Sequence, residues 1–433
     1  MLSSALVIAV IVVGGVTRLT ESGLSITEWR PITGVLPPLS RVEWESEFDK
    51  YKATPEFRLC ASFTCPSCLY PTNARTRFRL NSRMALDDFK SIYYMEWSHR
   101  ILGRAIGLTF VLPLAYFAAR RRLARTLRVP LISMAALLGA QGALGWYMVR
   151  SGLEEPVASG GGENAVPRVS QYRLAAHLGT ALALYAGMFA GALSVIADWR
   201  FARDGAWGRL RDGRTWDGVL RNPLVRRFKA HATIVTGLVF LTALSGTSLS
   251  RETLEYVYLN LSPGAFVAGL DAGLVFNEFP LMGGRLAPPL DELLSPSYSD
   301  AGDGGKGTWR NFFENPTTVQ FDHRVLAMTT YLATALLFAS SRRTAVRAAL
   351  PPLAVRTTAA AFAMANVQAA LGISTLLYLV PVPLAAAHQA GSVALLSAVV
   401  HLLLALRRPG AAARAWRQAN LARETAGKAK VTA

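Results

Sequence analysis

Residues 174–197, LAAHLGTALALYAGMFAGALSVIA, carry no charged side chain over the length that an α-helix needs to cross a bilayer, about 20 apolar residues. Further apolar runs occupy residues 101–118, 131–149, 231–246, 325–340, 358–380 and 384–406. The 433-residue chain is 52% apolar and only 17% charged, a composition that argues against a cytosolic enzyme. The sequence therefore predicts an all-α polytopic membrane protein.

The charged residues lie between the apolar runs. A net charge of +18, from 46 basic and 28 acidic residues, is compatible with nucleic-acid binding. The basic residues, however, concentrate in segments 120–128, 200–229 and 342–347 and in the tail from Arg407, whereas the other connections are acidic or balanced. By the positive-inside rule, the basic segments face the cytoplasm or the mitochondrial matrix. Both chain termini are expected on that side, and nucleic acid is not expected as a partner.

An even number of spans is needed to bring both termini to one side. Seven runs are present, so the apolar stretch at residues 2–16 is expected to be the first of eight spans. This stretch is short, and the sequence GGVTRLTESGLS at its end offers no signal-peptide cleavage site. We interpret it as a truncated span that no targeting sequence precedes.

The chain repeats itself at a spacing of about 210 to 230 residues, as internally duplicated membrane proteins do. The repeated segments follow the same order in both halves, and the weakest match comes first: TESGLSITEW (20–29) with LDAGLVFNEF (270–279), MEWSHR (95–100) with VQFDHR (319–324), QGALGWYM (141–148) with QAALGIST (368–375), and RLAAHLGTALALY (173–185) with LAAAHQAGSVALL (384–396).

This duplication predicts two tandem four-helix bundles, eight transmembrane helices in all, with both bundles in the same orientation. The expected boundaries are an N-terminal unit at 1–200, a basic linker at 201–229, a C-terminal unit at 230–408 and a basic tail at 409–433.

Four histidines occupy equivalent positions in the two halves. His99 corresponds to His323, and His177 corresponds to His388. Similar distances from the starts of their spans place the members of each half at similar depth, so each pair is expected to face across its bundle. Two opposed imidazoles are the axial ligands that six-coordinate haem iron needs.

The alternative for each histidine is an interfacial side chain hydrogen-bonded to backbone, but the recurrence of two pairs disfavours it. A metal site without porphyrin is also disfavoured, because no further ligand recurs with the histidines in both halves. The remaining histidines have no such pairing: we expect a structural role for His231 and an interfacial role for His401.

The two histidine pairs differ in one neighbouring residue. Glu96 precedes His99 by three positions, whereas Gln320 holds that place before His323, and this spacing puts each on the face of its histidine. A carboxyl group near a membrane site is a candidate for proton transfer, which an amide cannot perform. The first half is therefore expected to be the reaction site. The alternative is a structural ion pair of Glu96 with Arg100 or Arg104.

Arg100 and Arg324 directly follow the first histidine of each pair. A guanidinium group suits the propionates of a haem, and contact with lipid headgroups is the alternative of equal weight.

Several long motifs resemble haem A synthase in its mitochondrial form. The segments that carry this resemblance are RLTESGLSITEW, MEWSHRILGR, QGALGWYMVRSGLEE, RVSQYRLAAHLG, GLDAGLVFNEFPLMG, ENPTTVQFDHR and LGISTLLYLVPVPLAAAHQ, which extend along nearly the whole chain. The resemblance implies an enzyme of the mitochondrial inner membrane that oxidises a ring methyl of haem O to a formyl group, with oxygen from water, and so makes haem A for cytochrome c oxidase.

The same resemblance implies the roles of individual residues and partners. His99 and His177 would hold the substrate haem O, His323 and His388 would hold a haem b cofactor, and Glu96 would be essential. Implied partners are the haem O synthase that supplies the substrate, a ferredoxin-type electron donor, cytochrome c oxidase assembly factors and membrane lipid, with a homo-oligomer also compatible.

Two segments depart from the family pattern. Residues 60–79 and 247–264 interrupt stretches that are continuous in the family, and the second interrupts the fifth span. We hypothesise that both are retained introns, which a transcript without these codons would support. The first insertion holds Cys60, Cys65 and Cys68. Cys65 and Cys68 have the spacing of a redox CxxC motif, but no thioredoxin-like βαβ pattern surrounds them, and three cysteines fall short of a zinc site.

Two other classes of protein remain open. A dihaem b-type electron-transfer cytochrome would explain the four histidines but not Glu96 against Gln320. A transporter built on a tandem repeat would explain the duplication but not histidines at one depth.

Overall fold

A computed structural model describes residues 1–30, 33–54, 57, 84–154, 171–205, 210, 214–244, 270, 272–298 and 308–432. Helices make up the regular structure of these residues, which contain no strand beyond an isolated bridge between Met282 and Arg285. The all-α prediction is confirmed. Both suspected insertions, residues 60–79 and 247–264, lie outside the described residues.

Seven of the described helices are long and apolar enough to cross a membrane, which confirms a polytopic membrane protein. They are α1 (Leu2–Leu19), α5 (Leu86–Ala119), α6 (Arg125–Glu154), α7 (Gln171–Asp204), α13 (Pro316–Arg342), α15 (Pro352–Leu377) and α16 (Val382–Ala405). The expected fifth span coincides with α9 (Pro223–Leu244), whose first turns carry Arg226, Arg227 and Lys229 and whose described part ends at Leu244. The count of eight spans stays a prediction.

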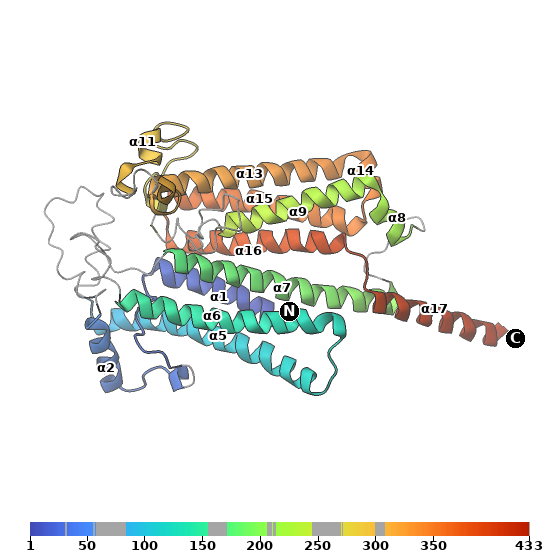
Figure 1. Ribbon diagram of the computed structural model, residues 1–433, viewed down its shortest axis with the longest axis horizontal. Helices are drawn as coiled ribbons and strands as arrows, with labels where there is room; N and C mark the ends of the chain where they lie inside the picture. The colour runs from blue at the N-terminus through green and yellow to red at the C-terminus, as the bar shows by residue number, and fades with distance from the viewer. Residues whose placement is uncertain are drawn as a thin grey trace.

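The long helices form two neighbouring groups. Helices α1, α5, α6 and α7 lie together, and α9, α13, α15 and α16 lie together beside them (Figure 1). Helices α5 and α13 both begin at the end where α2 (Arg41–Lys52) and α11 (Leu290–Leu293) lie (Figure 1). The groups follow one another along the chain, as the repeat predicts; the exact domain boundaries stay a prediction.

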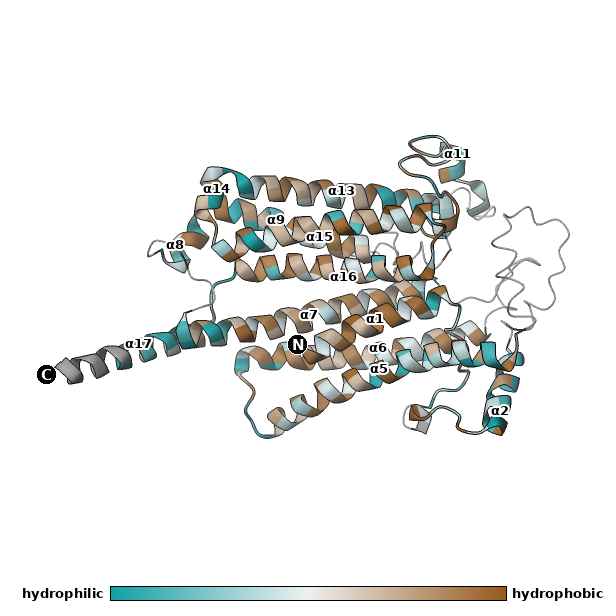
Figure 2. Ribbon diagram, turned by 180° about the vertical axis from the view of Figure 1, so that it is seen from behind, coloured by the Kyte–Doolittle hydropathy of each residue, from teal (hydrophilic) through white to brown (hydrophobic). Residues whose placement is uncertain are grey.

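The basic connections gather at the opposite end of the molecule. Helices α8 (Trp216–Arg221), α14 (Thr344–Ala349) and α17 (Ala411–Thr432) lie there (Figure 1). Hydrophobic residues dominate the middle of the long helices, and α17 is markedly hydrophilic where it leaves the bundle (Figure 2). This common end agrees with the placement of the basic segments on one side of a membrane.

Helix α2 fixes the first connection over the start of α5. Ser40 caps α2 and forms a capping box with Glu43. The apolar residues Trp44, Phe48 and Tyr51 recur at helical spacing and are buried against Phe89 of α5, with the rings of Phe48 and Phe89 stacked at 5.0 Å. The chain between α1 and α2 is therefore held close to the face of α5 that carries Glu96.

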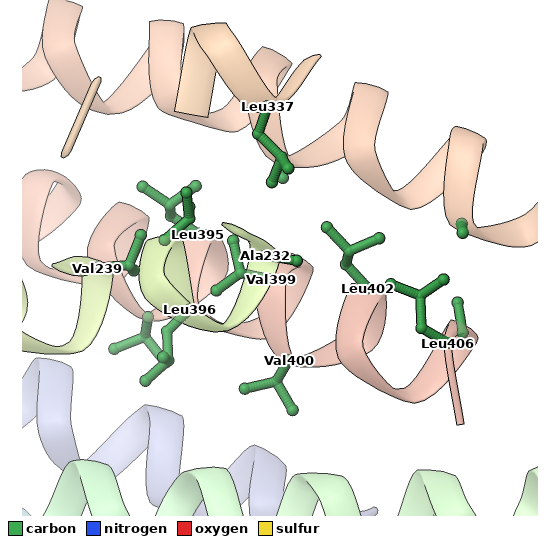
Figure 3. Close-up of a cluster of buried hydrophobic side chains, with 14 of the residues drawn as sticks. Ala232, Val239, Leu337, Leu395, Leu396, Val399, Val400, Leu402 and Leu406 are labelled. Atoms are coloured by element: carbon green, nitrogen blue, oxygen red, sulfur yellow. The ribbon is translucent and has the colours of Figure 1, made fainter. Parts of the chain in front are cut away.

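Helix α16 lies at the centre of the largest buried cluster. Its side chains Leu395, Val399 and Leu402 point towards α9 and α13, where Val239 and Leu337 meet them (Figure 3). The other side of α16 contacts the first half of the chain, where Tyr185 and Ser397 share a hydrogen bond of 2.5 Å between their hydroxyl groups. The helix that bears His388 is thus packed from both halves.

Candidate functional site

The four paired histidines lie on four long helices, near the end of the molecule where α2 and α11 are found. His99 is on α5 and His177 on α7 in the first half, while His323 is on α13 and His388 on α16 in the second. All four side chains are half-buried. No group of three or more His, Cys, Asp or Glu able to hold a metal ion occurs in the part of the chain that the structure describes.

The first pair has the spacing of two ligands on one iron. The ring centroids of His99 and His177 are 6.4 Å apart, and the ring planes are inclined at 57°. Two imidazoles bonded to one metal ion at about 2.0–2.1 Å would place their ring centres about 6.4 Å apart. The residues present therefore fit a haem held between α5 and α7.

The second pair, like the first, lies on the second and fourth long helices of its group. His323 and His388 lie close enough to interact electrostatically, and the His388 ring lies directly against the backbone of Gly372 on α15. The other two histidines are elsewhere. His231 is exposed on α9, and His401 lies 13 residues after His388 on the same helix, which is about 20 Å along its axis.

Glu96 is buried, and both of its carboxylate oxygens accept hydrogen bonds. One carboxylate oxygen accepts hydrogen bonds from the Ser25 hydroxyl at 2.7 Å and from the Ile26 N–H at 2.8 Å. The other accepts from Nε and Nη2 of Arg100, at 3.0 and 2.6 Å. All of these partners are donors, which suits a charged carboxylate. Glu96 thus joins α5 to the segment after α1, in the ion pair that the sequence offered as its alternative.

Arg100 reinforces the same connection. Its Nη1 donates to the carbonyl of Glu28 at 3.0 Å and its Nη2 to the carbonyl of Ile26 at 2.8 Å. The ring of Trp29 lies under the guanidinium at 5.8 Å. Arg104 binds the carbonyl of Arg30 rather than Glu96. The segment 25–30 is therefore held on α5 largely by two arginines and one carboxylate.

The second half repeats this arrangement without the carboxylate. Arg324 donates from Nη2 to the carbonyl of Phe276 and from Nη1 to the carbonyl of Leu281, both at 2.9 Å. Gln320 donates to the same Phe276 carbonyl at 2.9 Å. Phe276 corresponds to Ile26 in the repeat. Nε of Arg324 is buried and has no hydrogen-bond partner among the described residues.

Sequence reasoning missed several residues of these sites. Ser25, which binds Glu96, corresponds to Val275 in the second half, and that difference was a usable signal. Asp322 also escaped notice: it is half-buried next to His323, and its Oδ2 has no partner within the described segments. Its first-half counterpart is Ser98, so only comparison of the halves would have singled it out.

Comparison with known proteins places the chain in a family. The COX15-CtaA family, described as cytochrome oxidase assembly protein, matches residues 1–68, 69–258 and 250–400. This chain belongs to that family. The first two matches divide at residues 68 and 69 and the last two overlap at 250–258, so both divisions fall within the suspected insertions.

Individual members of the family match over most of this chain. Bovine heme A synthase COX15 is 44% identical over 408 residues, which are 94% of this chain and 80% of that protein. A heme A synthase of Nitrosospira multiformis is 39% identical over 93% of this chain and 91% of its own length. A heme A synthase–mitochondrial ferredoxin fusion protein of Schizosaccharomyces pombe is 43% identical over 92% of this chain, which spans 58% of the fusion.

Proposed function

We propose that this protein is a haem A synthase, which oxidises a ring methyl of haem O to a formyl group. The substrate haem O is held between His99 and His177, and a haem b cofactor is held between His323 and His388. Relatives that are named heme A synthase and are 39–44% identical along most of the chain support this assignment.

The observation that carries the proposal is the difference between equivalent neighbours of the two pairs. Glu96 and Gln320 occupy the same place in the repeat, and each binds the segment that precedes it. A carboxylate accepts and releases protons, whereas an amide does not. The first half is therefore the one equipped for a reaction that releases protons.

Within this proposal the chain's own residues orient the substrate and handle protons. Glu96 receives protons that leave as the methyl carbon is oxidised and water supplies the oxygen. Arg100 holds Glu96 in place and neutralises its charge, which is costly to bury alone. The free Nε of Arg324 is a donor for a haem propionate in the second half, and Arg100 would serve the first half through a rearranged guanidinium.

Haem iron supplies one-electron redox chemistry when it is bound. Oxidation of a methyl group to a formyl group with oxygen from water releases four electrons and four protons, so the site also needs a partner protein that accepts electrons. We propose a ferredoxin-type partner, since a relative that shares 43% identity is fused to a mitochondrial ferredoxin. A haem O synthase would deliver the substrate and cytochrome oxidase would receive the product through its assembly factors. The protein would lie in the mitochondrial inner membrane with both termini in the matrix.

The test is product analysis. The chain is expressed in a host that makes haem O but no haem A, and haems extracted from the purified protein are identified by chromatography and mass. Haem A in the extract, together with haem b, is the expected result.

A dihaem electron-transfer cytochrome is the alternative. It would retain haem b and leave haem O unchanged. Because the segments at 60–79 and 247–264 could by themselves inactivate the chain, a second form that lacks both is analysed in parallel. Haem-loaded protein that fails to convert haem O in both forms would refute the synthase assignment.

A further inference from the structure

Two glutamines bind the backbone at the second histidine of each pair. Gln141 on α6 donates from Nε2 to the carbonyl of His177 at 2.9 Å. Gln368 on α15 donates from Nε2 to the carbonyl of His388, also at 2.9 Å. The two glutamines are equivalent in the repeat, and the helices that carry them supply none of the four paired histidines. The same cross-helix bond is thus built twice.

A glycine follows each glutamine one helical turn later and faces the imidazole ring. A Cβ on Gly372 would lie 2.8 Å from Cε1 of His388 and 3.4 Å from its Nδ1. A Cβ on Gly145 would lie 3.5 Å from Cε1 of His177, which is an ordinary contact distance. The His388 ring therefore rests on bare backbone, and the His177 ring has slightly more room.

Ring hydrogen bonds do not account for the orientation of these two histidines. A metal-bound histidine commonly donates its second ring N–H to a carboxylate, a carbonyl or a water, which fixes the ring. Nδ1 of His177 and Nδ1 of His388 are buried and have no partner among the residues that the structure describes. The side chains need another means of orientation, and the neighbouring helix provides it.

We propose that Gln141, Gln368 and Gly372 are positioning residues for the haem ligands, with Gly145 as the roomier counterpart of Gly372. The glutamine fixes the position of the histidine backbone along the axis of the neighbouring helix. The glycine lets the imidazole lie flat against that helix, so that the ring is oriented by packing. This inference rests on the proposed haem-binding function and extends it to α6 and α15, which orient the ligands of α7 and α16.

Local packing supports this assignment in the second half. The Gln368 amide reaches the His388 carbonyl because Gly391 of α16 has no side chain; a Cβ there would overlap Oε1 of Gln368. Oε1 of Gln368 and Oε1 of Gln141 are buried without partners within the described part of the chain. Among the described residues each amide is therefore held by one hydrogen bond, the bond to the histidine carbonyl.

The test uses holoprotein from the host that makes haem O, because the two halves then carry distinguishable haems. Extracted haem O plus haem A reports the first half, and extracted haem b reports the second. The variants are Gly372→Ala, Gln368→Leu, Gly145→Ala and Gln141→Leu, and Gly142→Ala is the control, because a Cβ at Gly142 on α6 meets no atom within 4 Å.

Gly372→Ala is expected to reduce haem b retention by about 10-fold or more, the range seen when the partners of metal ligands are lost, with a shift in the absorption bands of the remaining haem b. Gln368→Leu should act on haem b only and Gln141→Leu on haem O and haem A only. Gly145→Ala should have a smaller effect than Gly372→Ala. The new methyl group at residue 372 meets a side-chain ring atom rather than backbone, so the helices should still assemble, which elution as a single species checks.

The results distinguish failure of the proposed function from failure of the positioning role. A parent protein that binds no haem either with or without residues 60–79 and 247–264 would refute the proposed function itself. The positioning role alone would be overturned if the parent binds both haems and Gly372→Ala and Gln368→Leu match Gly142→Ala in haem content and in absorption bands.

Discussion

The two halves bind equivalent segments of chain with opposite hydrogen-bond polarity. In the first half Glu96 accepts from the Ile26 N–H, whereas in the second Gln320 donates to the Phe276 carbonyl. The arginine one turn later donates to the carbonyl of the same residue in both halves, Ile26 or Phe276. Both halves therefore keep the hydrogen bond from the arginine to this carbonyl. The residue four positions before the arginine is Glu96 in one half and Gln320 in the other.

Under the proposed function, this difference marks where the roles of the two halves diverged after duplication. The histidine pairs, the arginines and the glutamine contacts recur, so both halves retain the residues that we propose to hold a haem. The carboxylate and its Ser25 partner occur only in the first half at these positions. Conversion of the substrate is therefore expected to depend on the carboxylate of Glu96, which the second half lacks at the equivalent position.

The largest expected effect is the removal of one ligand from one half. His99→Ala should abolish retention of haem O and haem A and leave haem b in place, and His323→Ala should do the reverse. Retention should fall by more than about 100-fold, because the loss of partners outside the ligand shell already costs 10–100-fold. Chromatography of extracted haems measures both. Loss of both haems in either variant would break the division into two independent sites.

The next effect compares the two arginines. Arg100→Leu leaves a buried carboxylate without its counter-ion and should lower the free energy of unfolding by about 3–5 kcal/mol. Arg324→Leu breaks hydrogen bonds to two carbonyl groups, together with an electrostatic attraction to the half-buried Glu278, and should cost about 1–3 kcal/mol. Denaturant unfolding in detergent measures both changes.

A control isolates the cause of this difference. In a Glu96→Gln background the Arg100→Leu substitution leaves no carboxylate unpaired. The loss of unfolding free energy that it causes should therefore fall to that caused by Arg324→Leu. Equal costs of the two arginine changes in the parent protein would show that the Glu96–Arg100 pair does not distinguish the halves.

A smaller effect tests Ser25. Ser25→Ala removes one of the hydrogen bonds to the charged Glu96 and should lower the free energy of unfolding by about 1.5–3 kcal/mol. Val275→Ala at the equivalent place is the matched change, and it should cost less than about 0.5 kcal/mol because Val275 is 44% exposed. A thermal unfolding series of both variants decides whether the serine belongs to the first-half site.

The smallest effect concerns pH in the first-half connection. Lys50 binds Glu28 at 3.0 Å and lowers the pKa of that carboxyl group. A lowered folded pKa means that the pair stabilises the protein above the ordinary carboxyl pKa and that this stability is lost as pH falls through the folded value. Both side chains are partly exposed, so Lys50→Gln should cost at most about 0.5 kcal/mol near pH 7 and nothing measurable in acid. A cost that grows on acidification would contradict this account.

The sequence predicts the architecture well where a simple physical demand governs it. Long apolar runs must be helical in lipid, because every backbone polar group has to be satisfied internally. The opposed placement of His99 and His177 follows from equal depth on neighbouring helices and is confirmed at 6.4 Å between ring centroids. The count of eight spans and the nature of segments 60–79 and 247–264 stay predictions.

The detailed environment of the histidines is harder to predict from the sequence. The contact of Glu96 with Ile26 joins residues 70 positions apart, and the weak match of segments 20–29 and 270–279 gave no reason to place that segment on α5. Glycines are frequent in membrane helices, so the sequence does not reveal that Gly372 faces a ring. Such contacts depend on helix rotation, which apolar periodicity leaves undetermined in spans that are apolar all round.

The most direct test of the central claim is the reciprocal exchange of the two equivalent residues. Glu96→Gln and Gln320→Glu are each expressed in the host that makes haem O, and extracted haems are identified by chromatography and mass. The account predicts that Glu96→Gln retains haem O and haem b but makes haem A at least about 100-fold more slowly, the contribution of a positioned proton-transfer group. It predicts that Gln320→Glu still makes haem A. Unchanged haem A production by Glu96→Gln would contradict the account.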